Sequence, residues 1–192
     1  MFKFILILLV QVALLNSSII EDETVAAYAD PVTVENVAFV KIGTYRGFTD
    51  DGSEYQKTYF LSRYSRPPWA ESRSFCKSYN MEFLSVETLT EARAYLSMLD
   101  NDSYLRSFGG AYIYVDGICL TSKSPTDWYW SNTGRRISFL IPWRAGQPNN
   151  GGGNEYCMTI YRPNIGERFG FDDATCMGSA FVGCYRVDFL LP

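Results

Sequence analysis

The spacing of hydrophobic residues changes along the chain, from helical in the first half to extended in the second. In residues 88–99, four apolar residues repeat at i, i+3, i+4 and i+7 and so share one helix face: Ala92, Tyr95, Leu96 and Leu99. Thr88 and Glu91 have the spacing of a capping box, which predicts that this helix begins at Thr88. A second helix is predicted over residues 69–78, after two prolines and before Asn80, a residue suited to a left-handed stop.

Short runs of aromatic and β-branched residues predict strands. They are residues 39–42, 58–62, 111–115, 127–130, 155–161 and 181–186. Turn-forming glycine, asparagine, proline and aspartate separate these runs, and residues 47–54 are such a turn-rich loop. Two helices followed by short strands and long loops predict an α+β fold. Residues 135–154 are long for a structureless connection, which indicates a functional loop.

The first 18 residues have the pattern of a secretory signal peptide. A lysine precedes an almost unbroken apolar run over residues 4–15, and small residues follow at Ser17 and Ser18. About a dozen apolar residues are too few to span a bilayer, and no later segment is long enough either. We therefore expect a signal peptide over residues 1–18, an acidic leader and loop over 19–54, and one domain over 55–192. The mature protein is expected to be secreted and extracellular, with no membrane span.

Composition narrows the function further. The 192 residues include 17 Lys and Arg against 21 Asp and Glu, a formal net charge of −4, and no histidine. Without histidine there is no Ser-His-Asp or Cys-His catalysis and no zinc site that needs imidazole. No run of lysine and arginine stands out, so nucleic acid is not an expected partner. An enzyme is not expected; the remaining catalytic alternative is a hydrolase that uses the carboxylates of Glu155, Asp172 and Asp173.

The long loop and the segment after it carry five side-chain oxygen donors. These are Gln147, Asn149, Glu155, Asp172 and Asp173. Ca²⁺ takes roughly six to eight oxygen ligands, so these five, with waters or the hydroxyls of a ligand, would complete its shell. The alternative is a Gly/Asn-rich surface turn with two unrelated acids nearby. On residue types alone, both interpretations stay open.

The order of these segments resembles the C-type lectin family over residues 59–186. The matching segments are residues 69–71 ahead of Cys76, and then 81–86, 130–134, 143–149, 154–157, 172–176 and 181–184. These segments are most like those of secreted single-domain lectins of arthropods. No cysteine precedes Cys76, so the chain resembles the short form of the family. The implied fold is an α+β C-type lectin-like domain with two helices, short antiparallel sheets and long loops, stapled by disulfides.

The resemblance also assigns the cysteines, whose spacing alone selects no pairing. Disulfides persist in the oxidising compartment that an exported chain enters. The family pairs its first cysteine with its last and its two middle ones together, which implies Cys76–Cys184 and Cys157–Cys176. Cys119 has no counterpart in the family. It is expected to be a buried thiol or, as the alternative, to link a dimer through an intermolecular disulfide.

By resemblance, the five oxygen donors hold one Ca²⁺, and Gln147, Asn149, Glu155 and Asp172 also bind the sugar. The peptide bond after Gln147 is then expected to be cis. Two residues depart from the mannose-type site, because Gln147 replaces an acid and Asp172 replaces the usual asparagine. The formal ligand charge of −3, from Glu155, Asp172 and Asp173, is the same after this double exchange.

Two functions follow from the resemblance. The first is a secreted, Ca²⁺-dependent carbohydrate-binding lectin, whose partners are glycans of a glycoprotein or of a microbial surface, as in innate immunity. The alternative is a lectin-fold protein-interaction module without significant sugar binding. Binding of simple monosaccharides is expected to be weak. The amides of Gln147 and Asn149 offer only donors to one sugar hydroxyl, while the carboxylates of Glu155 and Asp172 offer only acceptors to the other.

One modification motif fits an exported chain. Asn101 starts an Asn-x-Ser triplet directly after the second predicted helix. We therefore expect Asn101 to be an N-glycosylation acceptor.

Overall fold

The structure is a computed structural model, and it describes residues 38–49, 51–64, 66–121 and 127–190. The predicted signal peptide over residues 1–18 lies outside the described residues, as does the leader up to residue 37. Within the described ranges, no helix has the length and apolar composition of a membrane-spanning segment.

The described residues form an α+β fold, as predicted. The two α-helices are α3 (Trp69–Lys77) and α4 (Leu89–Asn101), and two short 3₁₀ helices are η1 (Leu105–Ser107) and η2 (Gly151–Gly153). The strands are β1 (Phe39–Phe48), β2 (Glu54–Ser62), β3 (Glu82–Phe83), β4 (Ala111–Cys119), β5 (Trp128–Trp130), β6 (Arg135–Arg136), β7 (Cys157–Arg162), β8 (Gly170–Ala174) and β9 (Phe181–Phe189).

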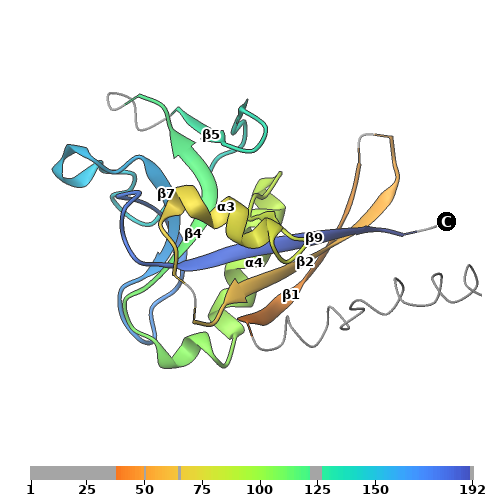
Figure 1. The fold of residues 1–192 in the computed structure, drawn as a ribbon, viewed down its shortest axis with the longest axis horizontal. Coiled ribbons are helices and arrows are strands. Elements are labelled where there is room, and N and C mark those ends of the chain that lie inside the picture. Colours follow the sequence, from red (N-terminus) through yellow and green to blue (C-terminus); the bar gives the residue numbers. More distant parts are fainter. Residues whose placement is uncertain (1–37, 50, 65, 122–126, 191–192) are drawn as a thin grey trace, which may run out of the picture. The chain divides into compact units, whose positions relative to one another are not determined.

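Strand β9 connects the two halves of the sheet (Figure 1). On one side it pairs with β2, which pairs with β1, and both pairings are antiparallel. On the other side it runs parallel to β4, in the register Ile113↔Phe181. Strand β4 then pairs antiparallel with β5 and β7, and β7 pairs with β8. The β7–β8 hairpin therefore lies beside β4. The predicted loop of residues 135–154 begins with the short strand β6, and the connection that follows, residues 137–156, is the long loop that leads directly into β7.

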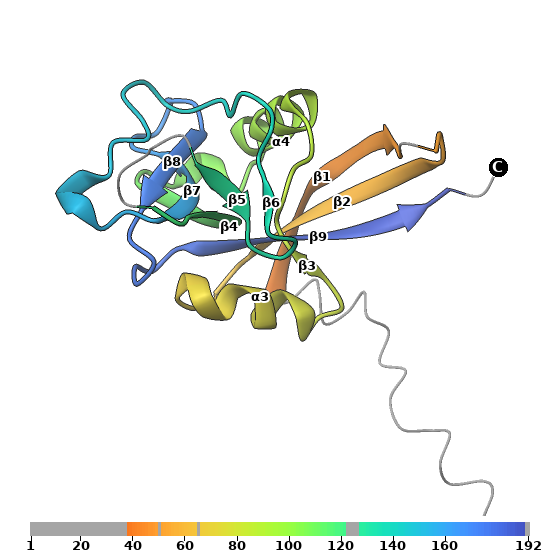
Figure 2. The ribbon, with the colours of Figure 1, turned by 90° about the horizontal axis from the view of Figure 1, so that it is seen from above.

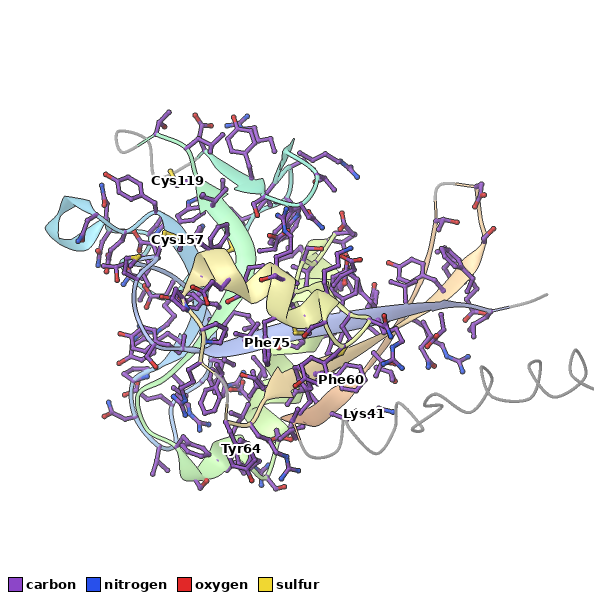
Figure 3. All side chains as sticks on the ribbon, in the orientation of Figure 1. Lys41, Phe60, Tyr64, Phe75, Cys119 and Cys157 are labelled. Atoms are coloured by element: carbon purple, nitrogen blue, oxygen red, sulfur yellow. A yellow bond between two sulfur atoms is a disulfide. The ribbon has the colours of Figure 1, made fainter. Side chains whose placement is uncertain are left out.

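Helices α3 and α4 lie on opposite sides of the strands β1, β2 and β9 (Figure 2). Alternate residues of β2 accordingly face different cores, since successive side chains of a strand point to opposite faces. Tyr59 and Leu61 pack in the larger core with α4, whereas Phe60 packs in the smaller core with Cys76 and the partly buried Phe75 of α3 (Figure 3). Strand β2 thus contributes side chains to both cores.

Helix α4 begins after the predicted N-cap, Thr88, with a variant of the capping box in which Glu91 reaches the amide one residue before the cap. The backbone N–H of Glu91 donates to Thr88 Oγ1 at 3.1 Å, and Glu91 Oε2 accepts from the backbone N–H of Glu87 at 2.7 Å. The predicted apolar face is buried at Ala92, Tyr95 and Leu99. The left-handed stop that was predicted after α3 is also present, because Asn80 has a φ of 55°.

Several strands differ from the predicted segments. The structure extends the predicted strand 39–42 to Phe48 and the strand 58–62 back to Glu54, so β1 lies in a region that the sequence analysis assigned to the leader and loop. Strands β3, β6 and β8 were not predicted. The sequence of β8, Gly170 to Ala174, contains two acids and a glycine. These residue types are depleted in strands, so the sequence pattern indicated a loop there.

Two disulfides staple the fold, with the pairing that the resemblance implies. Cys76–Cys184 joins α3 to β9 across a sequence separation of 108, and Cys157–Cys176 joins the start of β7 to the residues after β8 across a separation of 19. Cys119 lies outside both disulfides and is buried, with 7 % exposure, and its thiol donates to the carbonyl of Thr121. This burial agrees with the expectation of a buried thiol.

Candidate functional site

The long loop is attached to strand β8 at its start. The Trp143 ring packs against Trp128 and Phe171, with centroid distances of 5.2 and 6.5 Å. The backbone of Phe171 accepts from Arg144 N at 2.8 Å and donates to Pro142 O at 3.2 Å. Because Phe171 directly precedes Asp172 and Asp173, these contacts place the loop beside the two acids.

Asp173 and Glu155 hold the tip of the loop through backbone amides. Asp173 Oδ1 accepts from Asn149 N at 3.0 Å, and its Oδ2 accepts from Asn150 N at 2.6 Å. Glu155 Oε2 accepts from Gly151 N at 2.6 Å. The sequence allows the tight turn between them because Asn150, with φ of 48°, tolerates the left-handed region. Three of the five predicted donors, Asn149, Glu155 and Asp173, are thereby brought together.

Gln147 lies at the start of this turn, and its peptide bond to Pro148 is cis, as the resemblance implies. Its side-chain Oε1 is buried and has no hydrogen-bond partner among the described residues. A buried carbonyl oxygen without a partner is unfavourable by about 1–3 kcal/mol. The Gln147 oxygen is therefore available to a ligand that accepts electron density, such as a metal ion.

Two further donor oxygens share one small space. A methyl group built on Gly151 would lie 2.9 Å from Glu155 Oε2 and 3.1 Å from Asn149 Oδ1. Both side chains therefore point toward the same side of Gly151. A larger residue at position 151 would fill this space, so glycine keeps it open.

Asp172, the fifth predicted donor, is paired with a residue that sequence analysis missed. Arg144 Nη1 lies 2.7 Å from Asp172 Oδ2, and the Arg144 guanidinium lies over the Tyr161 ring, 4.8 Å from its centroid. The Tyr161 ring in turn stacks on Tyr112 at 3.9 Å between centroids. The sequence offers one hint of the role of Arg144, which stands three residues before Gln147 within the matching segment.

The acids of the site repel one another. Burial raises the pKa of the Glu155 carboxyl, and the charges of Asp173 and Asp172 raise it further, against the opposing hydrogen bond from Gly151. Burial also raises the pKa of Asp172, although Arg144 opposes this shift. Burial raises the pKa of Tyr112 to about 12, with contributions from the same charges of Asp172 and Glu155. The electrostatic potential at the site is therefore negative, which favours the binding of a cation.

The side chains fit Ca²⁺ in donor type, with one opposing group. Hard oxygen donors, mutual repulsion between acids and the orphaned oxygen of Gln147 all favour a divalent cation. Against this, the described residues contain no group of three or more Asp, Glu, Cys or His side chains close enough to hold a metal. The ion pair with Arg144 engages Oδ2 of Asp172. Ca²⁺ would then have to share the Asp172 carboxylate with Arg144 or displace Arg144 from it.

Asn101, the predicted glycosylation acceptor, is the last residue of α4 and is exposed. Its Nδ2 donates to the carbonyl of Ser97 at 2.8 Å, and its Oδ1 accepts from Arg106 at 3.4 Å. It lies near η1 rather than at the long loop.

The chain is similar in sequence to known C-type lectins. It is 26 % identical over 121 residues to a lectoxin, a C-type lectin of Thrasops jacksonii, covering 60 % of this chain and 68 % of that protein. It is 28 % identical over 123 residues to human C-type lectin domain family 4 member K, covering 62 % of this chain but 32 % of that protein. No protein-family model matches the chain.

Solved structures show the same fold. The carbohydrate-recognition domain of mouse scavenger receptor C-type lectin superimposes with a TM-score of 0.52 at 18 % identity, over 76 % of this chain and 95 % of that domain. The C-type lectin domain of murine dendritic cell inhibitory receptor 2, solved with an N-glycan, superimposes with a TM-score of 0.53 at 17 % identity, over 69 % and 91 %. Fold, disulfides and sequence relatives agree: the chain has the C-type lectin fold and is similar in sequence to C-type lectins.

Proposed function

We propose that this protein is a secreted, Ca²⁺-dependent carbohydrate-binding lectin. The observation that carries the proposal is the buried, unpartnered Oε1 of Gln147, beside a turn that Asp173 and Glu155 hold through backbone amides. The solved relative in complex with an N-glycan supports glycans as the partners. The proposed glycans belong to a glycoprotein or to a microbial surface.

In this proposal the calcium ligands are Gln147, Asn149, Glu155, Asp172 and Asp173. When bound, Ca²⁺ would supply a Lewis-acidic centre for two neighbouring hydroxyls of a sugar. The protein's own part is to orient those hydroxyls through hydrogen bonds. Gln147 and Asn149 offer amide donors, whereas Glu155 and Asp172 offer carboxylate acceptors.

This division of donors and acceptors predicts weak binding of simple hexoses. Each coordinated hydroxyl has one proton to give and one lone pair to fill, but one hydroxyl meets only donors and the other only acceptors. An unsatisfied group in such a site costs about 1–3 kcal/mol. We therefore propose dissociation constants above millimolar for the single domain, with little preference between mannose and galactose geometry.

The first test measures thermal unfolding with Ca²⁺ and with chelator. Ca²⁺ that binds the native state alone should stabilise it by about 2.7 kcal/mol at a hundredfold excess over Kd. Glu155→Ala and Asp173→Ala should abolish this response. Asp188→Ala, which removes an exposed acid on β9, serves as the matched control and should keep it. A melting temperature that is indifferent to Ca²⁺ and chelator would reject the calcium site.

The second test repairs the sugar site. Asp172→Asn should restore a donor to one hydroxyl, and Gln147→Glu combined with it should recreate the mannose-type pattern. Calorimetry with mannose should then show tighter binding for the double variant than for the unmodified domain. Micromolar binding of mannose by the unmodified domain would contradict the donor–acceptor argument.

One observation favours a second candidate function, a lectin-fold protein-interaction module without significant sugar binding. The ion pair of Arg144 with Asp172, at 2.7 Å, provides a cation at the site from the chain itself. Such a site needs no Ca²⁺ to balance Asp172. A glycan array with and without chelator discriminates the two functions, because only the lectin predicts glycan binding that chelator removes.

A further inference from the structure

A cleft lies at the end of the β7–β8 hairpin opposite the long loop. Its volume is about 770 Å³, within the range of roughly 300–1,000 Å³ that is usual for small-ligand sites. One wall is the face of α4 that carries Arg93, Leu96, Ser97 and Asp100, and the other is the β7–β8 connection. Strand β7 begins at Cys157 beside the long loop and ends at Arg162 in this cleft, so the two sites are separated by the length of the strand.

Four arginines line the cleft. They are Arg93 from α4, Arg106 from η1, Arg162 from the end of β7 and Arg168 from the β7–β8 connection. Two acids line it as well, but both are engaged within the protein. Asp100 Oδ1 accepts from Phe169 N at 2.9 Å, and Glu167 Oε1 accepts from Asn164 Nδ2 at 2.6 Å. A protein with a net charge of −4 thus has a locally cationic cleft.

The arginines at the rim are available to a ligand. Arg93, Arg106 and Arg168 are exposed, and within the described ranges none of them forms an ion pair. Arg106 makes one long hydrogen bond, 3.4 Å to Asn101 Oδ1. Guanidinium groups present a planar fork of donors that matches the oxygens of carboxylate, sulfate and phosphate groups.

Arg162 is the buried member of the set, with 3 % exposure. Its Nη2 donates to the carbonyls of Leu105 and Phe108, and its guanidinium lies 4.5 Å from the Phe169 ring centroid. Its Nε is buried and has no acceptor among the described residues. A charged N–H without an acceptor is unfavourable in a protein interior, so Arg162 adds unsatisfied positive charge to the wall of the cleft.

Apolar groups complete the lining. Leu96, Ile165 and Phe169 stand among the arginines, and Ile165 is 66 % exposed. A saccharide unit with an anionic substituent matches both the apolar and the cationic parts of this lining. Its C–H faces would pack on the apolar side chains, and its anionic group would bind the guanidinium groups. A bare inorganic anion would leave these apolar contacts unused.

We propose that this cleft binds an anionic saccharide through a sulfate or carboxylate group, independently of Ca²⁺. The site shares no residue with the proposed calcium and sugar ligands of the long loop. Binding at this cleft can therefore be tested independently of the proposed function of the long loop.

The test is calorimetry in the presence of EDTA with three hexasaccharides: a sulfated one of the heparin type, an unsulfated one that carries uronate groups, and neutral mannohexaose. Inorganic sulfate alone is a fourth probe. All proteins carry Ser103→Ala, which removes the glycosylation motif and keeps Asn101, a residue of the cleft wall. We expect binding of the sulfated probe, the uronate probe or both, and the pattern identifies the anionic group. Mannohexaose should not bind, and sulfate alone should bind at least tenfold more weakly.

Paired variants separate a built site from general charge attraction. Arg93→Gln/Arg168→Gln should weaken binding at least tenfold, because both side chains line the cleft and are exposed enough to be replaced without unfolding. Arg135→Gln/Arg136→Gln removes the same two charges from exposed β6 and should change binding less than twofold. Equal losses in both pairs, or no binding of either anionic probe in EDTA, would overturn the proposal. Glu155→Ala should leave binding in EDTA unchanged, which distinguishes this site from a failure of the calcium site.

Discussion

At the scale of single residues, Arg144 sets the charge balance of the proposed calcium site. Its guanidinium is about one-quarter exposed, whereas the Asp172 side chain that it contacts is 5 % exposed. The pair therefore holds an acid that would otherwise be a buried, repelled charge among its neighbours. In the proposed site, a calcium ion and Arg144 would compete for the same carboxylate.

This competition predicts the effect of Arg144→Gln on Ca²⁺ affinity. The substitution frees Asp172 and removes a positive charge that repels the ion, so Kd should fall by about fivefold, equivalent to about 1 kcal/mol. Calorimetric titration with Ca²⁺ measures it. Arg46→Gln, which removes an exposed arginine on β1, is the control and should leave Kd unchanged. Equal or weaker binding in Arg144→Gln would show that Arg144 supports the site instead of competing with Ca²⁺.

At the scale of elements, α4 is fixed to β2 by a buried ion pair. Lys57 Nζ lies 2.8 Å from Glu91 Oε1, and both side chains are almost fully buried. Tyr59 donates to the same oxygen at 2.6 Å, and Lys57 also donates to the carbonyl of Ser85 at 3.0 Å. Glu91 thus closes the capping box and joins helix to sheet with one side chain. Removing it leaves the Lys57 ammonium buried without its charge partner.

Glu91→Ala should therefore lower the free energy of unfolding by about 3–5 kcal/mol, the usual effect of breaking a buried ion pair. Urea unfolding measures this change. Glu82→Ala is the control, because its pair with Lys77 is exposed and should contribute about 1 kcal/mol or less. A loss in Glu91→Ala as small as that of the control would mean that Lys57 finds water or another partner.

The same helix shows what the sequence could and could not predict. The capping box and the apolar face of α4 depend on residues a few positions apart, so the sequence alone predicted them. The partner of Glu91 is 34 positions away on β2, and no local pattern indicates it. Strand β1 was predicted too short for a related reason. Gly43 and Gly47 suggest a turn, but they stand where Met98 and Tyr55 pack against the strand, within 2.7 Å of where a Cβ would be.

At the scale of the whole molecule, the family resemblance supplied what periodicity could not. The five proposed calcium ligands come from two segments, and their sequence order suggested a common site that spacing alone left open. The basic cleft gave no such signal, because its arginines are spread over 75 positions and meet through the packing of α4 against the β7–β8 connection. The sequence left two interpretations of Cys119 open, since composition does not reveal exposure.

The two disulfides divide the chain into nested closed loops. On the chain-entropy model, the loops with separations of 108 and 19 stabilise the fold by about 4.7 and about 3 kcal/mol. The smaller loop contains β7, β8 and the basic connection between them. The larger loop contains that hairpin, α4 and all five proposed calcium ligands.

The larger disulfide loop also determines how the domain responds to mechanical force. Tension applied to the two ends of the domain passes through β1, β2 and α3 to Cys76, crosses the sulfur bridge, and leaves through the rest of β9. The residues between Cys76 and Cys184 bear no load while that bridge is intact, so in a domain tethered at its ends both proposed ligand sites lie outside the path of the force. Single-molecule pulling should therefore release only the outer segments first, and reduction of both bridges should then add roughly 380 Å of contour length.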